Sequence, residues 1–163
     1  MGSILARFID ILRLRSGPQD MPGNWSLAIF LCLAYIAEGF YADHLLGVTE
    51  DTPRSLLAIT VQFLAVAILL NIKRVASRLP QTLSALAGAG LLFGFLSLLL
   101  ISQAEADKNQ PVLALVWFAV FLWSLAVDAH IYRHALSITM SLGVLVAVMI
   151  FAVNFILIET VFG

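Results

Sequence analysis

The carboxy-terminal part of the chain is an apolar stretch from Pro111 to Gly163, interrupted by a polar cluster at 128–134. As one helix, about 50 residues at about 1.5 Å each would far exceed the roughly 30 Å hydrocarbon core of a bilayer. The stretch must therefore cross a membrane twice. The cluster, Asp-Ala-His-Ile-Tyr-Arg-His, predicts a polar turn at the cytoplasmic face, with candidate residues Asp128, His130, Arg133 and His134.

Other polar breaks divide the chain into five predicted spans, at about 25–46, 55–72, 83–102, 111–127 and 136–158. Composition agrees with this division: 61% of the residues are hydrophobic, 12% are charged, and the mean hydropathy is +1.00. Soluble domains are only about half apolar and about one-quarter charged. The predicted fold is therefore all-α and polytopic, with residues 1–163 forming a single integral membrane domain.

Residues 3–15 predict a short helix that lies on the membrane surface. Apolar side chains recur there at helical spacing, and the charged side chains fall on the other side. Such a basic, amphipathic segment is too short to span a bilayer. A Pro- and Gly-rich break follows at 17–24, and its last residue, Asn24, is expected to cap the first span. The fold is thus a bundle of five transmembrane helices behind an amphipathic interfacial helix.

The distribution of basic residues predicts the orientation. Of the nine Lys and Arg residues, two fall on one side of the predicted spans, Arg54 and Lys108. The others fall on the opposite side: Arg7, Arg13, Arg15, Lys73, Arg74, Arg78 and Arg133. Because basic residues favour the cytoplasmic side, we expect a bacterial inner-membrane protein with a cytoplasmic N-terminus and a periplasmic C-terminus. Scattered basic residues make no nucleic-acid footprint, so membrane lipids are the expected surroundings.

Glu38, Gln62 and Asn154 form a candidate intramembrane polar cluster. Counting residues from the ends of their spans places all three at similar depth, so we expect them to lie near one another. An ionisable group inside a span costs several kcal/mol unless it is paired, wetted or neutral. Two interpretations stay open. The cluster is a station for a proton, ion or substrate, or a set of interhelical hydrogen bonds that hold the bundle together.

The third predicted span is rich in small residues, and Gly88, Gly90 and Gly94 are its candidate helix-packing positions. Small residues let helix backbones approach closely in a membrane. The partner is either another span of the same chain or a second copy of the protein. Packing within the chain is the favoured alternative.

His130 and His134 lie four residues apart, a spacing that can hold a metal on one helical face. We favour the alternative, polar anchors at headgroup level, because two histidines and the single nearby acid, Asp128, are a weak metal signal. No metal or other cofactor is therefore predicted. The sequence has no nucleophile and base pair, phosphate loop or zinc-protease motif, which indicates a protein that is not an enzyme.

Several features resemble the Yip family of small multi-pass membrane proteins. They are the five closely spaced spans behind a short amphipathic segment, Arg-Leu-Pro-Gln-Thr-Leu-Ser-Ala-Leu-Ala-Gly-Ala-Gly at 78–90, Trp-Ser-Leu-Ala-Val at 123–127 and Arg-His-Ala-Leu at 133–136. The resemblance implies a non-enzymatic integral membrane component without catalytic residues. Eukaryotic members act in vesicle traffic with small GTPases through longer cytosolic N-terminal regions. This chain is expected to lack such a region, so that role is not transferred.

These observations lead to two functional hypotheses. The first is a non-enzymatic component that organises the bacterial inner membrane through contacts with other membrane proteins or with copies of itself. The second is a small transporter or channel subunit that uses the polar cluster around Glu38.

Overall fold

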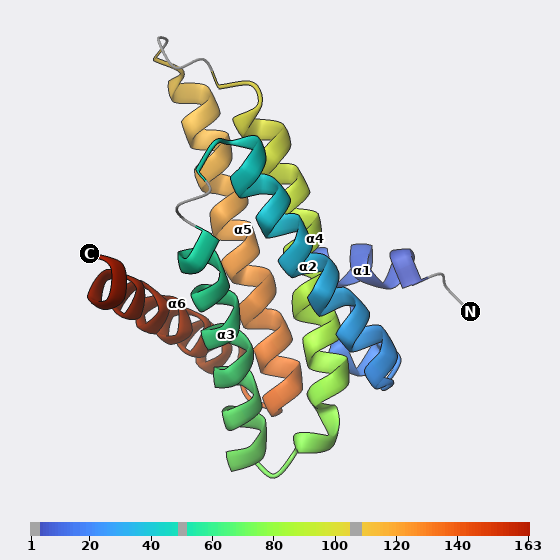
Figure 1. The fold of residues 1–163 in the computed structure, drawn as a ribbon. Coiled ribbons are helices and arrows are strands. Elements are labelled where there is room, and N and C mark those ends of the chain that lie inside the picture. Colours follow the sequence, from blue (N-terminus) through green and yellow to red (C-terminus); the bar gives the residue numbers. More distant parts are fainter. Residues whose placement is uncertain (1–3, 49–51, 105–108) are drawn as a thin grey trace.

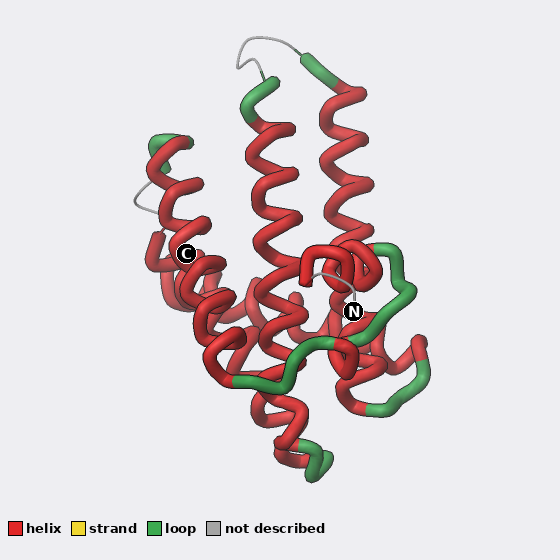
Figure 2. The backbone as a smooth tube through the Cα atoms, turned by 90° about the vertical axis from the view of Figure 1, so that its right-hand side faces the viewer, coloured by secondary structure: helices red, strands yellow, loops and turns green. Residues whose placement is uncertain are grey.

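The computed structural model of this chain describes residues 4–48, 52–104 and 109–163. Within these ranges the chain forms helices and loops and no strand (Figure 2). Five helices are long and apolar enough to cross a membrane, and a short helix precedes them, which confirms the predicted all-α fold. The protein is a multi-span helical membrane protein.

Figure 1 shows the order and arrangement of the helices. They are α1 (Ile4–Leu12), η1 (Pro18–Asp20), α2 (Trp25–Leu45), α3 (Thr52–Ile72), η3 (Ala76–Arg78), α4 (Leu79–Ile101), α5 (Pro111–Leu136) and α6 (Met140–Phe162). The bounds of α2, α3 and α4 differ from the prediction by at most four residues at an end. Helix α1 is shorter than the predicted 3–15; residue 3 and Lys108 lie outside the described ranges.

Local signals in the sequence explain where the long helices begin. Asn24 caps α2, as expected, because its Oδ1 accepts a hydrogen bond from the Leu27 amide at 2.6 Å. Helices α4 and α5 each have a proline in the first turn, where a missing N–H costs no helical hydrogen bond. The side chain of Thr139 caps α6 by accepting from the Leu142 amide at 3.4 Å.

The chain turns between α5 and α6 at 137–139, so the predicted polar turn at 128–134 is wrong. Asp128, His130, Arg133 and His134 instead lie in the last turns of α5. Helix α5 therefore ends at residue 136 rather than 127, and α6 covers 140–162 rather than 136–158. The physical reason is that most of these polar side chains find partners beside the helix. The break comes where Ser137 adopts a left-handed conformation with φ of 53°.

Helices α4 and α5 form the centre of the bundle. Helix α2 packs along α4, α6 packs along α5, and α1 crosses α4 and α5 on one side (Figure 1). Helix α6 is inclined to α5, and its C-terminal end reaches the start of α3, where Arg54 donates to the Phe162 carbonyl oxygen at 3.1 Å. Helix α3 makes its main contact with α6 and few contacts with α4 or α5. This sparse packing leaves space between α3 and the centre.

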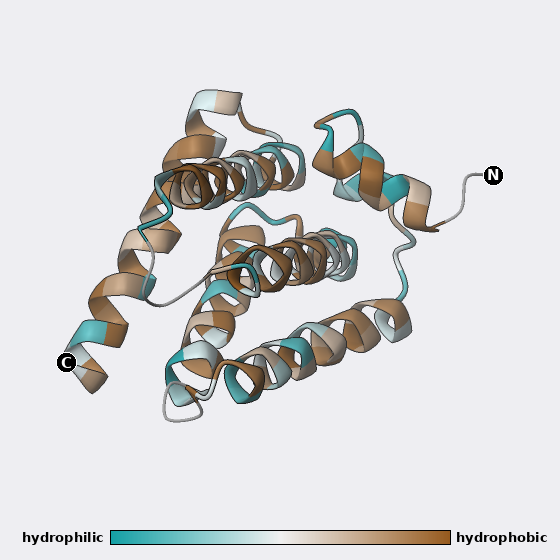
Figure 3. Ribbon diagram, turned by 90° about the horizontal axis from the view of Figure 1, so that it is seen from above, coloured by the Kyte–Doolittle hydropathy of each residue, from teal (hydrophilic) through white to brown (hydrophobic). Residues whose placement is uncertain are grey.

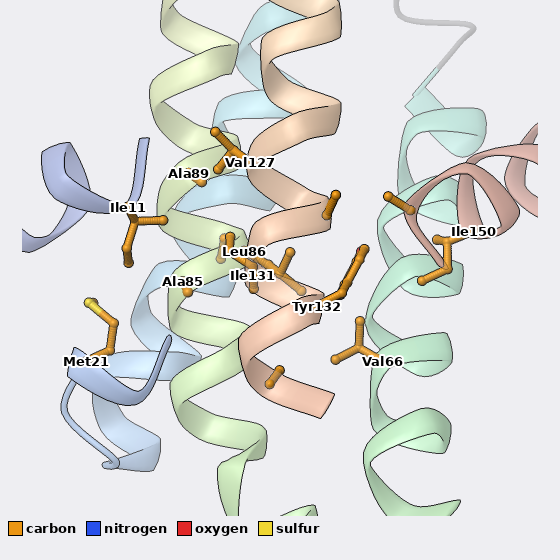
Figure 4. Close-up of a cluster of buried hydrophobic side chains, with 14 of the residues drawn as sticks. Ile11, Met21, Val66, Ala85, Leu86, Ala89, Val127, Ile131, Tyr132 and Ile150 are labelled. Carbon is orange, nitrogen blue, oxygen red and sulfur yellow. The ribbon is translucent and has the colours of Figure 1, made fainter. Parts of the chain in front are cut away.

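The core lies toward one end of the bundle. We call it the basic end, where the α3–α4 connection (73–78) and the α5–α6 connection (137–139) lie; the opposite end is the far end. Buried residues concentrate at 80–89 of α4 and 127–136 of α5, and Figure 4 shows their side chains meeting between the two helices. Elsewhere, hydrophobic residues predominate on the long helices, hydrophilic residues are frequent at the connections, and α1 carries both kinds (Figure 3). A hydrophobic outer surface is what helices in lipid require.

Candidate functional site

A cavity of about 440 Å³ lies between α2, α3, α4 and α5. Its polar lining residues are Tyr35, Glu38, Ser55, Gln62, Ser97, Ser124 and Asp128. Two of these are carboxylic acids, and none of the described residues that line the cavity is Lys, Arg or His. The wall reaches from Leu46 and Ile101, beside the far end, to Leu86 and Asp128 in the basic-end half of their helices. The cavity thus enters deeply into the bundle.

Glu38 carries the carboxyl group on the α2 side of the cavity. Its side chain is only 9% exposed, and it has no hydrogen bond or ion pair with any residue that the structure describes. A buried carboxylate normally has a partner, because desolvation of an unpaired charge is costly. The Glu38 carboxyl group is therefore left available to whatever enters the cavity.

Small residues on α4 make room for the side chains that face it. A Cβ atom at Gly94 would lie 2.5 Å from Glu38 Oε2, and one at Gly90 would lie 2.8 Å from the Tyr35 ring. A Cβ atom at Gly88 would collide with the ring of Phe8 on α1. The three glycines that the sequence offered as packing positions thus face α1 and α2 of the same chain.

Asp128 carries the second carboxyl group, on α5. The Gln62 amide Nε2 donates to Asp128 Oδ2 at 3.4 Å and to the Tyr132 hydroxyl at 3.4 Å. Tyr132 is 2% exposed and points from α5 toward α3 (Figure 4). Long hydrogen bonds of this kind are weak. Gln62 and Tyr132 therefore tie α3 to α5 loosely beside the cavity.

A second cavity of about 130 Å³ adjoins the first, with Gln62, Ser124 and Asp128 lining both. Asn154 of α6 lines this smaller cavity, where its Oδ1 is buried without a hydrogen-bond partner among the described residues. The candidate cluster is therefore divided: Glu38 shares the larger cavity with Gln62, and Asn154 shares the smaller one with Gln62. Glu38 and Asn154 line no common cavity.

His130 and His134 hold the N-terminal segment against α5. His130 Nε2 lies 3.0 Å from the carbonyl oxygen of Ser16, to which it donates, and His134 Nδ1 lies 3.4 Å from Gln19 Nε2. Arg133 is exposed. In the described part of the chain, no three His, Cys, Asp or Glu side chains come together in a way that could hold a metal ion.

Comparison with known proteins adds no identification. No family model, curated protein or solved structure matches this chain. The resemblance to the Yip family therefore stays a prediction. The function has to be argued from the cavity and its residues.

Asp128 lines the cavity and does not lie in the turn at the membrane surface that its sequence context predicts. Two signals of this placement were present. Asp128 and Tyr132 are four residues apart, so a continuing helix would place both on one face. In addition, Thr139 is a favoured residue for a helix N-cap, and the short segment 137–139 offers a better turn than the cluster before it.

Proposed function

We propose that this protein is a small transporter whose solute-binding site is the cavity around Glu38. The observation that carries the proposal is a buried carboxyl group without a hydrogen-bond or ion-pair partner in the described ranges of the chain, on a cavity of about 440 Å³ inside a membrane bundle. Small-molecule sites are typically concave, about 300–1,000 Å³ in volume, mostly apolar, and supplied with a few polar groups. Ionisable residues inside spans usually mark pathways for ions or substrates.

Polar groups at several depths support transport over a purely structural role. Glu38 lies seven residues from the far end of α2, or about 10 Å along the helix. Asp128 lies eight residues from the basic end of α5, or about 12 Å. Gln62, at the middle of α3, borders both cavities. A solute that enters from the far end thus meets polar groups in both halves of the bundle.

The accessibility of engineered cysteines tests this proposal. With Cys32, the native cysteine, replaced by alanine, Ser97→Cys places a thiol on the cavity wall. Leu99→Cys, two residues along α4, is the matched control, because Leu99 is 60% exposed on the outer surface. A charged, membrane-impermeant thiol reagent should label the Ser97→Cys variant in vesicles and leave the Leu99→Cys variant unlabelled. Equal labelling of the two variants, or none at Ser97→Cys, would contradict a water-filled site.

A second candidate is an organising role, in which the protein is a non-enzymatic component of a bacterial inner membrane and resembles the Yip family. The support for this role is the exposed aromatic surface in the far-end half of α5, where Trp117 and Phe118 face outward. Aromatic residues are enriched at protein–protein interfaces. Native mass analysis after purification in mild detergent tests this role. Bound partner proteins would favour the organiser, whereas a chain without other proteins would favour the transporter.

A further inference from the structure

The charge of the larger cavity indicates what kind of solute fits it. Among the residues that the structure describes, Glu38 and Asp128 are its only ionisable lining residues apart from Tyr35, and no basic side chain lines it. Glu38 is nine-tenths buried and has no hydrogen bond or ion pair with a described residue. An ionised carboxylate in such surroundings is stabilised by a positive charge beside it. An anion would add like charge to the site, and a neutral solute would leave the carboxylates uncompensated.

We propose that the cavity binds a small organic cation, with an ammonium or guanidinium group beside Glu38. This inference rests on the proposed function and names the class of its solute. Carboxylates form their strongest hydrogen bonds with such groups. Gly94 allows the Glu38 carboxyl group to lie directly against the backbone of α4. The group is therefore placed at the cavity wall and not at the membrane surface.

The rest of the lining favours an organic cation over a bare metal ion. Tyr35 and Phe93 contribute aromatic rings, and Ile59, Leu86 and Leu98 contribute apolar surface. Aromatic rings attract alkylammonium and guanidinium groups through cation–π interactions, and apolar walls suit hydrocarbon substituents. Hard metal ions need several oxygen ligands at short distances. Among the described residues, no group of three or more acidic, His or Cys side chains offers them.

The two carboxyl groups are not equivalent. Asp128 already accepts a hydrogen bond from Gln62, whereas no residue that the structure describes donates one to Glu38. Glu38 should therefore be the main counter-charge of the bound cation, and Asp128 should contribute from a greater distance along the cavity. Removing the charge of Glu38 should weaken binding more than removing that of Asp128.

The test measures binding of benzyltrimethylammonium to the purified full-length protein in mild detergent, by equilibrium dialysis. Benzenesulfonate, an anion with the same ring, is the matched ligand control. We expect the cation to bind and the anion not to bind. Glu38→Gln should weaken cation binding at least about tenfold and Asp128→Asn by less. Glu159→Gln, the same substitution at an exposed position near the end of α6, should leave binding unchanged.

A second measurement does not depend on the folding of the Glu38→Gln variant. Benzyltrimethylammonium should slow thiol labelling of the Ser97→Cys variant, and benzenesulfonate should not. If Ser97→Cys is labelled but the cation neither binds nor protects, the cation proposal falls and the transporter proposal stands. Cation binding that survives both carboxyl substitutions also overturns the cation proposal. If Ser97→Cys is not labelled at all, both proposals fall.

Discussion

At the scale of single residues, the absence of a side chain at Gly94 determines where the Glu38 carboxyl group lies. In a helix, Gly is usually less favourable than Ala by about 0.5–1 kcal/mol, because its backbone loses more freedom on folding. A glycine inside α4 therefore lowers the stability of this helix locally. Glycine is nevertheless needed at position 94, because any Cβ atom there would overlap the carboxylate oxygens of Glu38.

This argument predicts a difference between two glycine substitutions. Gly39→Ala adds a Cβ atom that meets nothing within 4 Å, so it should raise the free energy of unfolding by about 0.5–1 kcal/mol. Gly94→Ala should raise the free energy of unfolding by less than Gly39→Ala does, because the new methyl group forces the Glu38 side chain to move. Unfolding in sodium dodecyl sulfate, followed by circular dichroism, measures both variants. An equal gain for the two would show that Glu38 does not lie against Gly94.

The buried amide of Asn154 leads to a second prediction. Its Oδ1 has no hydrogen-bond partner among the described residues, and an unsatisfied buried polar group costs about 1–3 kcal/mol. Asn154→Leu should therefore raise the free energy of unfolding by about 1 kcal/mol. Asn71→Leu, at an exposed position near the end of α3, should change it little. A loss of stability in the Asn154→Leu variant would mean that this amide has a partner in the folded protein.

At the scale of elements, apolar length predicts the number of long helices but not where α5 ends. The cluster at 128–134 was interpreted as a turn because polar residues usually mark the ends of spans. In the structure, Asp128 and His130 have partners on α3 and on the segment after α1. Such partners come from distant parts of the chain, so the local sequence does not reveal them. The helix continues until Ser137 changes the backbone direction.

The docking of α1 gives a prediction at this scale. The Phe8 ring packs on Gly88, and the Trp123 indole donates to the Leu12 carbonyl oxygen at 2.9 Å. Gly88→Leu should displace Phe8 and detach α1, which should speed amide hydrogen exchange at 4–12 at least about tenfold while the spans stay protected. The double variant Gly88→Leu/Phe8→Ala removes the colliding ring and should recover much of the protection. No recovery would mean that another contact fixes α1.

At the scale of the whole molecule, depth counting identified only part of the site. It matched Glu38 with Gln62, which line one cavity. It also matched them with Asn154, but Asn154 lines the smaller cavity with Gln62 and not the larger one with Glu38. Helix α6, which carries Asn154, is inclined to the other spans (Figure 1). Helix tilt and relative shift depend on packing between spans and on interfacial anchors. Counting residues along one helix gives neither the tilt of that helix nor its shift relative to its neighbours.

The odd number of spans predicts that the two ends of the chain lie in different compartments. From the five candidate spans and the excess of basic residues at the basic end, we expect the N-terminus to lie in the cytoplasm. Alkaline phosphatase fused after Gly163 should be active in a bacterial host, and a fluorescent protein fused before Met1 should fluoresce. If both reporters indicate the same side of the membrane, the chain cannot cross it five times. The depths assigned to Glu38 and Asp128 would then be wrong as well.

Arg78 fastens the basic end of the bundle. One guanidinium nitrogen, Nη1, donates to the carbonyl oxygens of His134 and Ala135 at 3.3 and 3.1 Å, and to the Ser137 hydroxyl at 2.8 Å. The start of α4 is thereby clamped to the hairpin of α5 and α6. Helix α3 is held to α6 by the hydrogen bond from Arg54 to the Phe162 carbonyl oxygen at 3.1 Å, and to α5 by the hydrogen bonds of Gln62 at 3.4 Å. If the cavity opens alternately to two compartments, we expect its walls to separate at the long Gln62 contacts and the contacts of Arg78 to stay in place.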